Sequence, residues 1–426
     1  MSDPTQPQHR SVFAPLRSRS FAFVWTGSVV SNIGTWMQAA ALGFYVAHLT
    51  KSATWTAVVA IGEFAPTALL GPIGGAIADR YSRRAIAMFT TLEQTIAASI
   101  ITFLMVVGKP GAPVIAIYAL SNGCMFALGF PSLQSMTPEF VPKEDLSGAI
   151  GLSSAAWNLG RVLGPVIGAL IYKQWGITWV LGINAASFLA VLFALSMIRL
   201  AKRPPNNVPI FAAIAEGLRF IRNEPGLNIT IRALTLNTLC IAPFIGLIPA
   251  MVEKVYRGHQ GDVSRLITAQ GIGAVITGFM FARLTRRYSL RQVFTAALWL
   301  GPIAIIAYGL APNSWYALVP LICTGAIYFA VMTSVNNIAQ LRAPTEFRGR
   351  VLSTNQVVLG SVYSVALAIQ GRLGDVFGVR EVTIGSGVAL LAALTILSVT
   401  HPDALDAIEQ PVDPGPLPTN PPVQVH

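Results

Sequence analysis

Long apolar segments alternate with short polar ones along almost the whole chain. A helix needs about 20 mostly apolar residues to cross the hydrocarbon core of a bilayer, and twelve segments reach that length. They are 20–48, 54–78, 85–107, 112–136, 147–172, 177–199, 229–252, 264–284, 291–311, 314–340, 348–371 and 379–400. The pattern predicts an all-α membrane protein with twelve transmembrane helices in two six-helix halves.

The polar segments define the domain organisation. In the stretch between the sixth and seventh spans, Ile210, Ile214, Leu218 and Ile221 recur at helical spacing, which predicts an amphipathic helix on the membrane surface. The last 26 residues hold seven prolines and cannot bury a core, so we expect them to be disordered. The expected parts are an N-terminal arm 1–19, a six-helix bundle 20–199, a linker 200–228, a second bundle 229–400 and a tail 401–426.

Two turns of the chain repeat one another 207 residues apart. Arg80, Tyr81, Ser82 and Arg84 map at this offset onto Arg287, Tyr288, Ser289 and Arg291. The same offset places Glu139-Phe140 on Glu346-Phe347. A single offset that fits two separate turns indicates a duplicated half. Many transporters place their substrate site between two such halves.

Composition and charge agree with a membrane protein. Apolar residues make up 53% of the chain and charged residues 11%, against about 25% charged in soluble domains. The net charge is +11, but the basic residues lie in short turns between apolar spans, so we expect no nucleic-acid partner. Of the 29 Lys and Arg, 20 lie in turns or span ends on the side of the termini, 8 on the opposite side, and Arg161 near the middle of a span. Since cytoplasmic loops carry the positive excess, both termini are expected in the cytoplasm.

Signatures of enzymatic chemistry are absent from the sequence. No His, Cys and carboxylate residues share a metal-ligand spacing, and there is no Gly-rich phosphate loop or nucleophile elbow. We therefore expect no metal, no cofactor and no enzymatic activity.

The turn after the second span resembles the signature of the major facilitator superfamily, Gly-x-x-x-Asp-Arg-x-Gly-Arg-Arg. The matching residues are Gly75, Asp79, Arg80, Arg83 and Arg84, with Ser82 in place of the second Gly. The resemblance implies the major facilitator fold and a latch in which the acid and the arginines join the two halves on the cytoplasmic side. An Asp near a helix N-terminus and neighbouring arginines can supply such contacts. The alternative is that these arginines only set the topology.

The fifth span resembles the family's Gly-x-x-x-Gly-Pro-x-x-Gly-Gly signature, which is associated with exporters. The matching residues are Gly160, Gly164, Pro165 and Gly168, with Ala169 in the last position. Gly160, Gly164 and Gly168 share one helix face, so another helix can approach closely there. Simple helix packing is the alternative interpretation.

Further segments resemble the enterobactin-exporter and macrolide-efflux branch of the superfamily. They are Phe21–Trp25, Asn32–Gln38 and Asn158–Pro165. The resemblance implies a bacterial inner-membrane exporter of a small organic solute, either a siderophore or a drug-like molecule, in exchange for protons. We expect the exporter to function as a monomer. A proton-coupled importer and a transporter-shaped sensor or accessory protein remain the alternatives.

Polar residues inside spans are the candidates for the cavity. A charge at mid-membrane is costly, so Arg161 is expected to face the bundle interior, either as a substrate anchor or in a structural ion pair. Glu63 and Glu93 are the acids within spans that could pair with it or exchange protons. The remaining candidates are uncharged: Asn32, Trp36, Asn237, Asn336 and Gln356.

Overall fold

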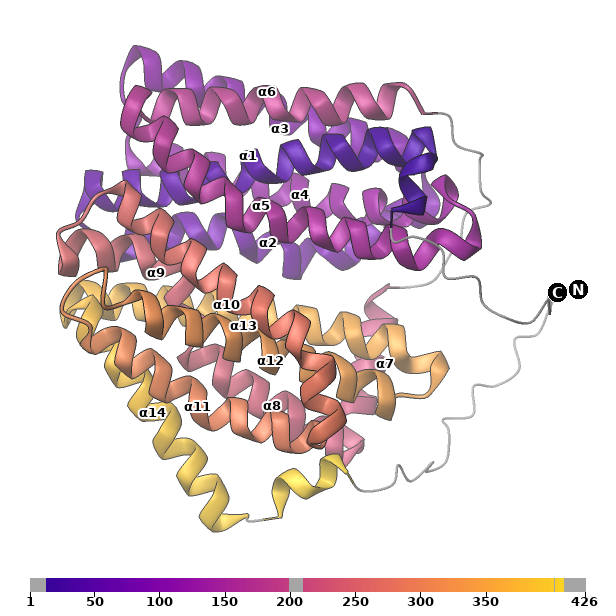
Figure 1. The fold of residues 1–426 in the computed structure, drawn as a ribbon, viewed down its shortest axis with the longest axis vertical. Helices are drawn as coiled ribbons and strands as arrows, with labels where there is room; N and C mark the ends of the chain where they lie inside the picture. Colours follow the sequence, from indigo (N-terminus) through magenta and orange to yellow (C-terminus); the bar gives the residue numbers. More distant parts are fainter. Residues whose placement is uncertain (1–12, 199–209, 402, 410–426) are drawn as a thin grey trace, which may run out of the picture.

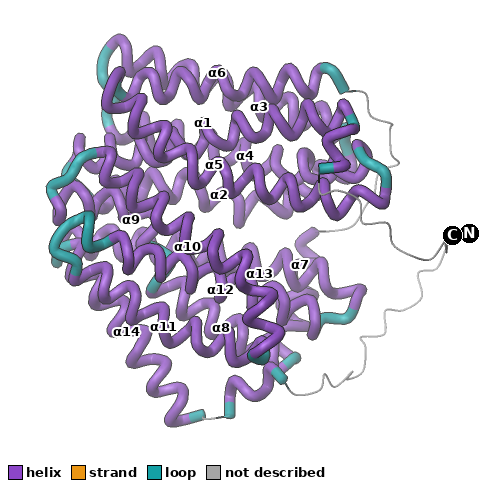
Figure 2. The backbone as a smooth tube through the Cα atoms, in the orientation of Figure 1, coloured by secondary structure: helices purple, strands orange, loops and turns teal. Residues whose placement is uncertain are grey.

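The computed structural model describes residues 13–198, 210–401 and 403–409 (Figure 1). Most of the expected N-terminal arm and tail, and the first part of the linker, lie outside these residues. Within them the regular structure is entirely helical (Figure 2). The first half contains α1 (Arg19–Thr50), α2 (Ala53–Arg80), α3 (Arg83–Val107), α4 (Ala112–Phe140), α5 (Leu146–Trp175) and α6 (Ile177–Ser196). The second contains α7 (Ile210–Asn223), α8 (Pro225–Cys240), α9 (Phe244–Met251), α10 (Gln260–Arg287), α11 (Leu290–Leu310), α12 (Leu318–Arg342), α13 (Thr345–Val376) and α14 (Val379–Thr400).

The two halves lie side by side with their long helices running roughly in one direction (Figure 1). We call the end where α1 begins and α6 ends the linker end, and the opposite end, where α1 ends and α2 begins, the far end. The amphipathic helix α7 lies at the linker end and packs on α13 of the second half. Gly217 of α7 lies so close that a Cβ there would be 2.7 Å from the carbonyl oxygen of Arg350. The helix that joins the halves in sequence is therefore fastened to the second half.

Eleven stretches among the described residues are long and apolar enough to cross a membrane. The twelfth expected span, α1, is a 32-residue helix that is not among them. Its polar residues Ser28, Ser31, Asn32 and Thr35 lower its hydropathy, and they line a cavity described below. The fold prediction of a twelve-helix membrane protein is thus confirmed.

The seventh span is broken and begins earlier than the expected 229–252. Glu224 caps α8 at the backbone nitrogen of Leu227, and Pro225 occupies the first turn, where a missing N–H costs nothing. α8 ends at Cys240, and the chain continues through Pro243 into α9 and a π-helical turn, Val252–Tyr256. Proline has no backbone N–H to donate to the helix, so the run of helical hydrogen bonds is interrupted here. Proline does not interrupt the apolar pattern, so that pattern alone does not reveal the break.

The structure repeats the 207-residue offset found in the sequence. α2 and α10 are both 28 residues long, and Ala53–Arg80 shifted by 207 gives Gln260–Arg287. The hydroxyl of Ser82 caps α3 and that of Ser289 caps α11, each accepting from the backbone nitrogen three residues on. The repeated sequence therefore encodes a repeated helix–turn–helix unit.

The halves meet mainly through two helix pairs, α2 with α13 and α5 with α10. Small residues line the antiparallel crossing of α2 and α13. A Cβ placed on Gly360, Gly371 or Gly374 would lie 2.1, 2.6 or 3.3 Å from the Cβ of Ala68, Ala57 or Ala53, respectively. We call these six residues the small-residue seam. Close backbone approach of this kind brings the halves together from the middle of the molecule to the far end.

Candidate functional site

A cavity of about 850 Å³ lies mainly within the first half, with one wall formed by α13. Its lining runs from Phe21, Trp25 and Phe140, near the linker end, to Trp36 and Glu63 in mid-bundle. Among the described residues that line it, none comes from the turns at the far end. The cavity therefore extends toward the linker end, while the seam and its surroundings close the far end.

An aromatic cluster forms one wall of the cavity. Trp157 of α5 lies at its centre, with ring centroids 5.7 Å from Trp36, 5.7 Å from Phe126 and 6.0 Å from Phe130. Phe64 extends the cluster, 6.4 Å from Trp36. Phe126 and Phe130 are four residues apart on α4, so they share a helix face. Such a wall offers flat apolar surface and the negative faces of aromatic rings, which attract cations.

Uncharged hydrogen-bonding groups and one carboxyl complete the lining. Gln94 donates to Asn122 Oδ1 at 3.0 Å, which orders two of the amides. Among the described lining residues, Glu63 is the only one with an ionisable side chain. The amides that line the cavity are Asn32, Gln94, Asn122, Gln134, Asn158 and Gln356.

The local structure of α2 places Glu63 in the cavity wall. Pro66 removes the helical hydrogen bond to the carbonyl of Gly62, and Gly123 of α4 packs against that carbonyl. A Cβ on Gly123 would lie 2.2 Å from the Gly62 oxygen, so only glycine fits this close approach. Within the described part of the chain, the Glu63 carboxyl has no hydrogen-bond or ion-pair partner. It is therefore available to bind a proton or a cationic group.

The structure divides the eight cavity candidates into two groups. Glu63, Asn32, Trp36 and Gln356 line the cavity. Four others are not among the described lining residues: Arg161, Glu93, Asn237 and Asn336. Asn237 and Asn336 lie on α8 and α12, which supply none of the described lining.

Glu93 and Asn237 face neighbouring helices. Glu93 accepts a hydrogen bond from the hydroxyl of Ser121 on α4 at 2.6 Å. Asn237 is 2% exposed, within the second half. Asn336 is exposed on α12. These three residues are thus separated from the cavity that holds Glu63.

Arg161 lies where α5 crosses α10, between the halves. A Cβ on Gly271 of α10 would be 3.8 Å from its Nε. Its Nε and Nη2 are buried and have no hydrogen-bond partner among the described residues. An ion pair with Glu63 or Glu93, one of the two possibilities that the sequence left open for Arg161, is thus not formed in this conformation.

The glycines of the fifth span pack against α1. A Cβ on Gly160 would lie 2.8 Å from Asn32, one on Gly164 2.7 Å from the carbonyl oxygen of Ile33, and one on Gly168 2.6 Å from Cγ of Met37. Pro165 lies inside α5 between these contacts. The glycine face therefore holds α1 and α5 together and places Asn32 and Trp36 beside Trp157.

The arginines of the turn after α2 bind inside the first half. Arg83 Nη1 donates to the carbonyl oxygen of Ser135 at 2.9 Å and to Glu139 of α4 at 3.0 Å. Arg84 donates to the carbonyl oxygens of Leu195 and Ser196 at the end of α6, where the helix dipole favours a cation. Arg80 is exposed, and open space surrounds Gly75. The side chain of Asp79 lies outside the described part of the structure, so the latch across the halves stays a prediction.

Sequence reasoning missed most of the aromatic wall. Phe64, Phe126, Phe130 and Trp157 lie in apolar spans, where aromatic residues are unremarkable by themselves. The i, i+4 spacing on α4 and the position of Trp157 beside Asn158 were the available signals.

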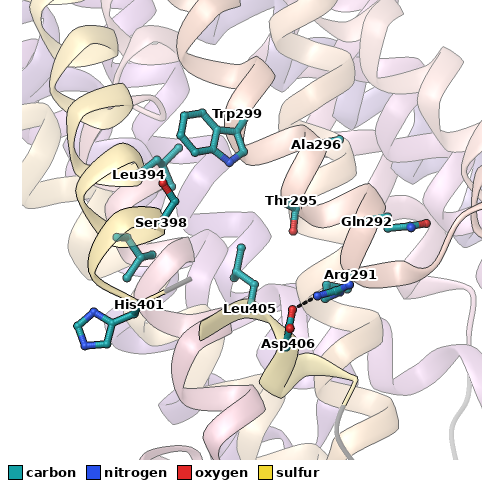
Figure 3. Close-up of a pocket in the computed structure, with 11 residues that line it drawn as sticks. Arg291, Gln292, Thr295, Ala296, Trp299, Leu394, Ser398, His401, Leu405 and Asp406 are labelled. Atoms are coloured by element: carbon teal, nitrogen blue, oxygen red, sulfur yellow. Dashed lines mark ion pairs between the residues drawn. The ribbon is translucent and has the colours of Figure 1, made fainter. Parts of the chain in front are cut away.

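A second, smaller cavity of about 480 Å³ lies at the linker end of the second half (Figure 3). It lies between α11, α14 and the short helix η4 (Ala404–Ile408), with Trp299 and Leu394 on its walls. Arg291 of α11 pairs with Asp406 at its edge, as Figure 3 shows, and with Glu409 at 3.1 Å. These ion pairs dock the C-terminal segment on the second half.

Two helical halves, with a cavity that lies mainly in the first half, is walled on one side by α13 and opens toward one end, have the architecture of a membrane transporter of the major facilitator class. The chain belongs to the Transmembrane secretion effector family, whose sequence profile matches residues 10–421. This family consists of transporters rather than enzymes.

The similar proteins are efflux transporters. The chain is 23% identical over 380 residues to macrolide efflux protein A of Streptococcus pyogenes, covering 87% of this chain and 93% of that protein. It is 24% identical to the multidrug efflux pump Tap of Mycolicibacterium fortuitum, covering 85% and 91% of the two chains. It is 25% identical to the enterobactin exporter EntS of Shigella boydii, covering 87% and 89%.

Solved structures share the fold. A peptide transporter of the POT family superposes with a TM-score of 0.75 at 11% identity, covering 92% of this chain and 96% of that chain. A bacterial homologue of the human lysosomal transporter Spinster superposes with a TM-score of 0.67 at 14% identity, covering 93% and 98%. At these identities the likeness concerns the fold alone.

Proposed function

We propose that the protein exports an amphipathic, drug-like organic solute that carries a basic amine, in exchange for protons, by alternating access of its two halves. One observation carries this proposal: an aromatic cavity whose described lining has a single ionisable residue, the acid Glu63. Its volume of about 850 Å³ suits a drug-sized ligand.

The charge in the cavity favours a cation over an anion. A siderophore that binds iron through anionic oxygens would place negative charge beside Glu63, and no Lys or Arg is present among the described lining residues to compensate it. An ammonium group can pair with Glu63 while the apolar part of the solute lies against Trp36 and Trp157. This supports a drug-like amine rather than a siderophore as the solute.

The same carboxyl supports proton exchange. A carboxylate can hold either a proton or an ammonium ion, so binding of one displaces the other. If protonation occurs when the cavity faces outward, the amine is released outside and the proton is carried inward. One chain contains the whole cavity, which supports function as a monomer.

The direction of export depends on the linker end facing the cytoplasm of a bacterial cell, across its inner membrane. The excess of basic residues at that end supports this orientation. Reporter enzymes fused after chosen residues test this orientation. One reporter is active only in the cytoplasm and the other only outside the inner membrane. The cytoplasmic reporter should be active after Arg84, Arg222 and Arg350, and the exported one after Lys51, Lys109 and Arg257.

Transport into inverted membrane vesicles tests the function itself. Vesicles that contain the protein should accumulate two amine-bearing compounds, the basic macrolide erythromycin or the permanent cation rhodamine 6G, when their interior is acidified, and a protonophore should abolish the accumulation. Vesicles without the protein provide the baseline. Accumulation of enterobactin instead of the amines would move the assignment to siderophore export. Uptake by right-side-out vesicles under an inward proton gradient would indicate an importer, and no movement in either would leave a sensor or accessory protein.

A further inference from the structure

The N-terminus of α2, at the far end, is capped by an acid from the other half of the protein. Ser52 is the N-cap residue, and the first turn of α2 has no acidic residue. Asp375, in the last turn of α13, accepts hydrogen bonds from the Ser52 hydroxyl at 2.6 Å and from the backbone nitrogens of Ala53 at 2.6 Å and Thr54 at 2.9 Å. Its carboxylate thus satisfies backbone N–H groups that have no partner within the helix and lies at the positive end of the helix dipole.

Two consecutive residues of the π-helical turn after α9 extend this contact. Lys254 donates to Asp375 Oδ1 at 2.8 Å. Glu253 lies 3.1 Å from Nδ1 of His48, near the end of α1, and pairs with Lys51. The Lys254–Asp375 pair is partly buried, with side chains 26% and 18% exposed, so solvent screens it less than an ordinary surface pair. The partners of Glu253, His48 and Lys51, are mostly exposed. We call these five residues, with Ser52, the far-end cluster.

Comparison of α2 with its counterpart α10 shows that the fold does not require a helix cap supplied by the other half. α10, the counterpart of α2, carries its own acid: Asp262 in its first turn accepts from the backbone nitrogen of His259 at 2.8 Å in a capping box. α2 has no such acid and takes Asp375 instead. The acid cap of α10 therefore persists whatever the relative position of the halves. α2 keeps the cap of its own Ser52, whose hydroxyl accepts from the backbone nitrogen of Trp55 at 3.2 Å, but its acid cap exists only when the halves meet at the far end.

The far-end cluster also lies directly beside the small-residue seam. Ala53 and Gly374, whose Cβ positions are 3.3 Å apart, are neighbours in sequence of Ser52 and Asp375. Any separation of α2 from α13 at this end must break the bonds of Asp375.

We propose that the far-end cluster is the gate that holds the far end closed while the cavity is open toward the linker end. Asp375 is its central residue, because it joins the N-terminus of α2 to Lys254, and Glu253 forms the second contact across the halves. The inference rests only on the proposed alternating access of the halves. It does not depend on the solute, the coupling ion or the direction of transport.

Chemical labelling of a cysteine placed between the halves tests the gate without any transported solute. Ala60 of α2 packs against the core of the second half, so a cysteine there reacts with a membrane-impermeant maleimide from the far end only when the halves separate. The background is the full chain with Cys124, Cys240 and Cys323 replaced by Ala. The labelling rate of Ala60→Cys then measures the population of the far-end-open state, even when it is rare.

Asp375→Asn should raise this rate about tenfold, since loss of charged hydrogen bonds shifts the equilibrium by at least that factor. Asp262→Asn is the matched control, because it removes an acid from a helix cap at the same end without a contact between the halves. Its labelling rate should stay within about twofold of the parent, given that the far-end equilibrium is unchanged.

Equal labelling rates in Asp375→Asn and Asp262→Asn would overturn the proposal. If Asp375→Asn does not accumulate in the membrane, Glu253→Gln tests the second contact in the same way, and an unchanged rate there would also overturn it. A normal gate in a protein that moves no amine would instead count against the proposed function alone.

Discussion

Replacement of Glu63 by Gln tests the binding chemistry of the cavity. The substitution keeps the size and hydrogen-bonding capacity of the side chain and removes its charge. A hydrogen bond to a charged partner contributes about 1.5–3 kcal/mol, and about 1.4 kcal/mol corresponds to a factor of ten in affinity. The Kd for a lipophilic cation should therefore rise roughly 10- to 150-fold. The aromatic contacts of Trp36 and Trp157 stay in place, so binding should weaken rather than disappear.

The measurement is fluorescence polarisation of rhodamine 6G with the purified protein in lipid nanodiscs. Glu93→Gln is the matched control, since it makes the same chemical change in a carboxyl that bonds to Ser121 and is absent from the described cavity lining. Its Kd should change by less than about threefold, as expected for a site without direct contact. Chloramphenicol, which is uncharged, should bind with similar affinity to the parent and to Glu63→Gln.

Two results would refute this reasoning. An unchanged Kd for rhodamine 6G in Glu63→Gln would show that its charge does not bind the cation. Equal weakening in Glu63→Gln and Glu93→Gln would show that loss of membrane-embedded charge, and not the cavity contact, is responsible.

Three further predictions concern the polar groups outside this contact. Asp79→Asn should lower transport while leaving insertion intact, because it weakens a contact formed in one conformation only; normal transport with an unchanged pattern of cysteine crosslinks at the linker end would reduce the turn to a topology signal. Arg161→Ala should abolish transport at normal expression, and Arg161→Lys should restore it poorly, since lysine lacks the planar guanidinium; full transport by Arg161→Ala would exclude a functional role. Glu224→Ala should destabilise the protein by about 3–5 kcal/mol, because it leaves the buried guanidinium of Arg342 without its carboxylate. In thermal denaturation followed by size-exclusion chromatography, Glu224→Ala with Arg342→Met should regain most of the loss, and a double variant no more stable than Glu224→Ala would contradict this account.

Much of the architecture can be predicted from short segments of the sequence. The apolar spans, the 207-residue repeat and the amphipathic helix follow from residue order, because a helix buries its face with a fixed period wherever it lies. The apolar pattern did not predict the break at Pro243 or the early start of α8 at Pro225, because helix capping and proline geometry decide both.

The candidate site depended on how each helix is rotated in the bundle. Glu63 and Glu93 are both acids within apolar spans, and nothing in the sequence ranks them decisively. Packing of α2 on α4 at Gly62 and Gly123 places one in the cavity, whereas the other bonds to Ser121. The crossing of α5 with α10 placed Arg161 between the halves for the same reason.

The sequence by itself thus determined what kind of protein this is: hydrophobicity, helical period and the duplicated turns specify a two-half membrane bundle. Only the tertiary structure decided which residues act together. Asp375 caps a helix whose N-cap residue, Ser52, is 323 residues away in the sequence. Trp157 completes a wall with side chains from three other helices. Such groupings depend on how each helix is rotated and on the relative position of the halves. Side-chain packing across the whole molecule sets both, so no local pattern in the sequence predicts them.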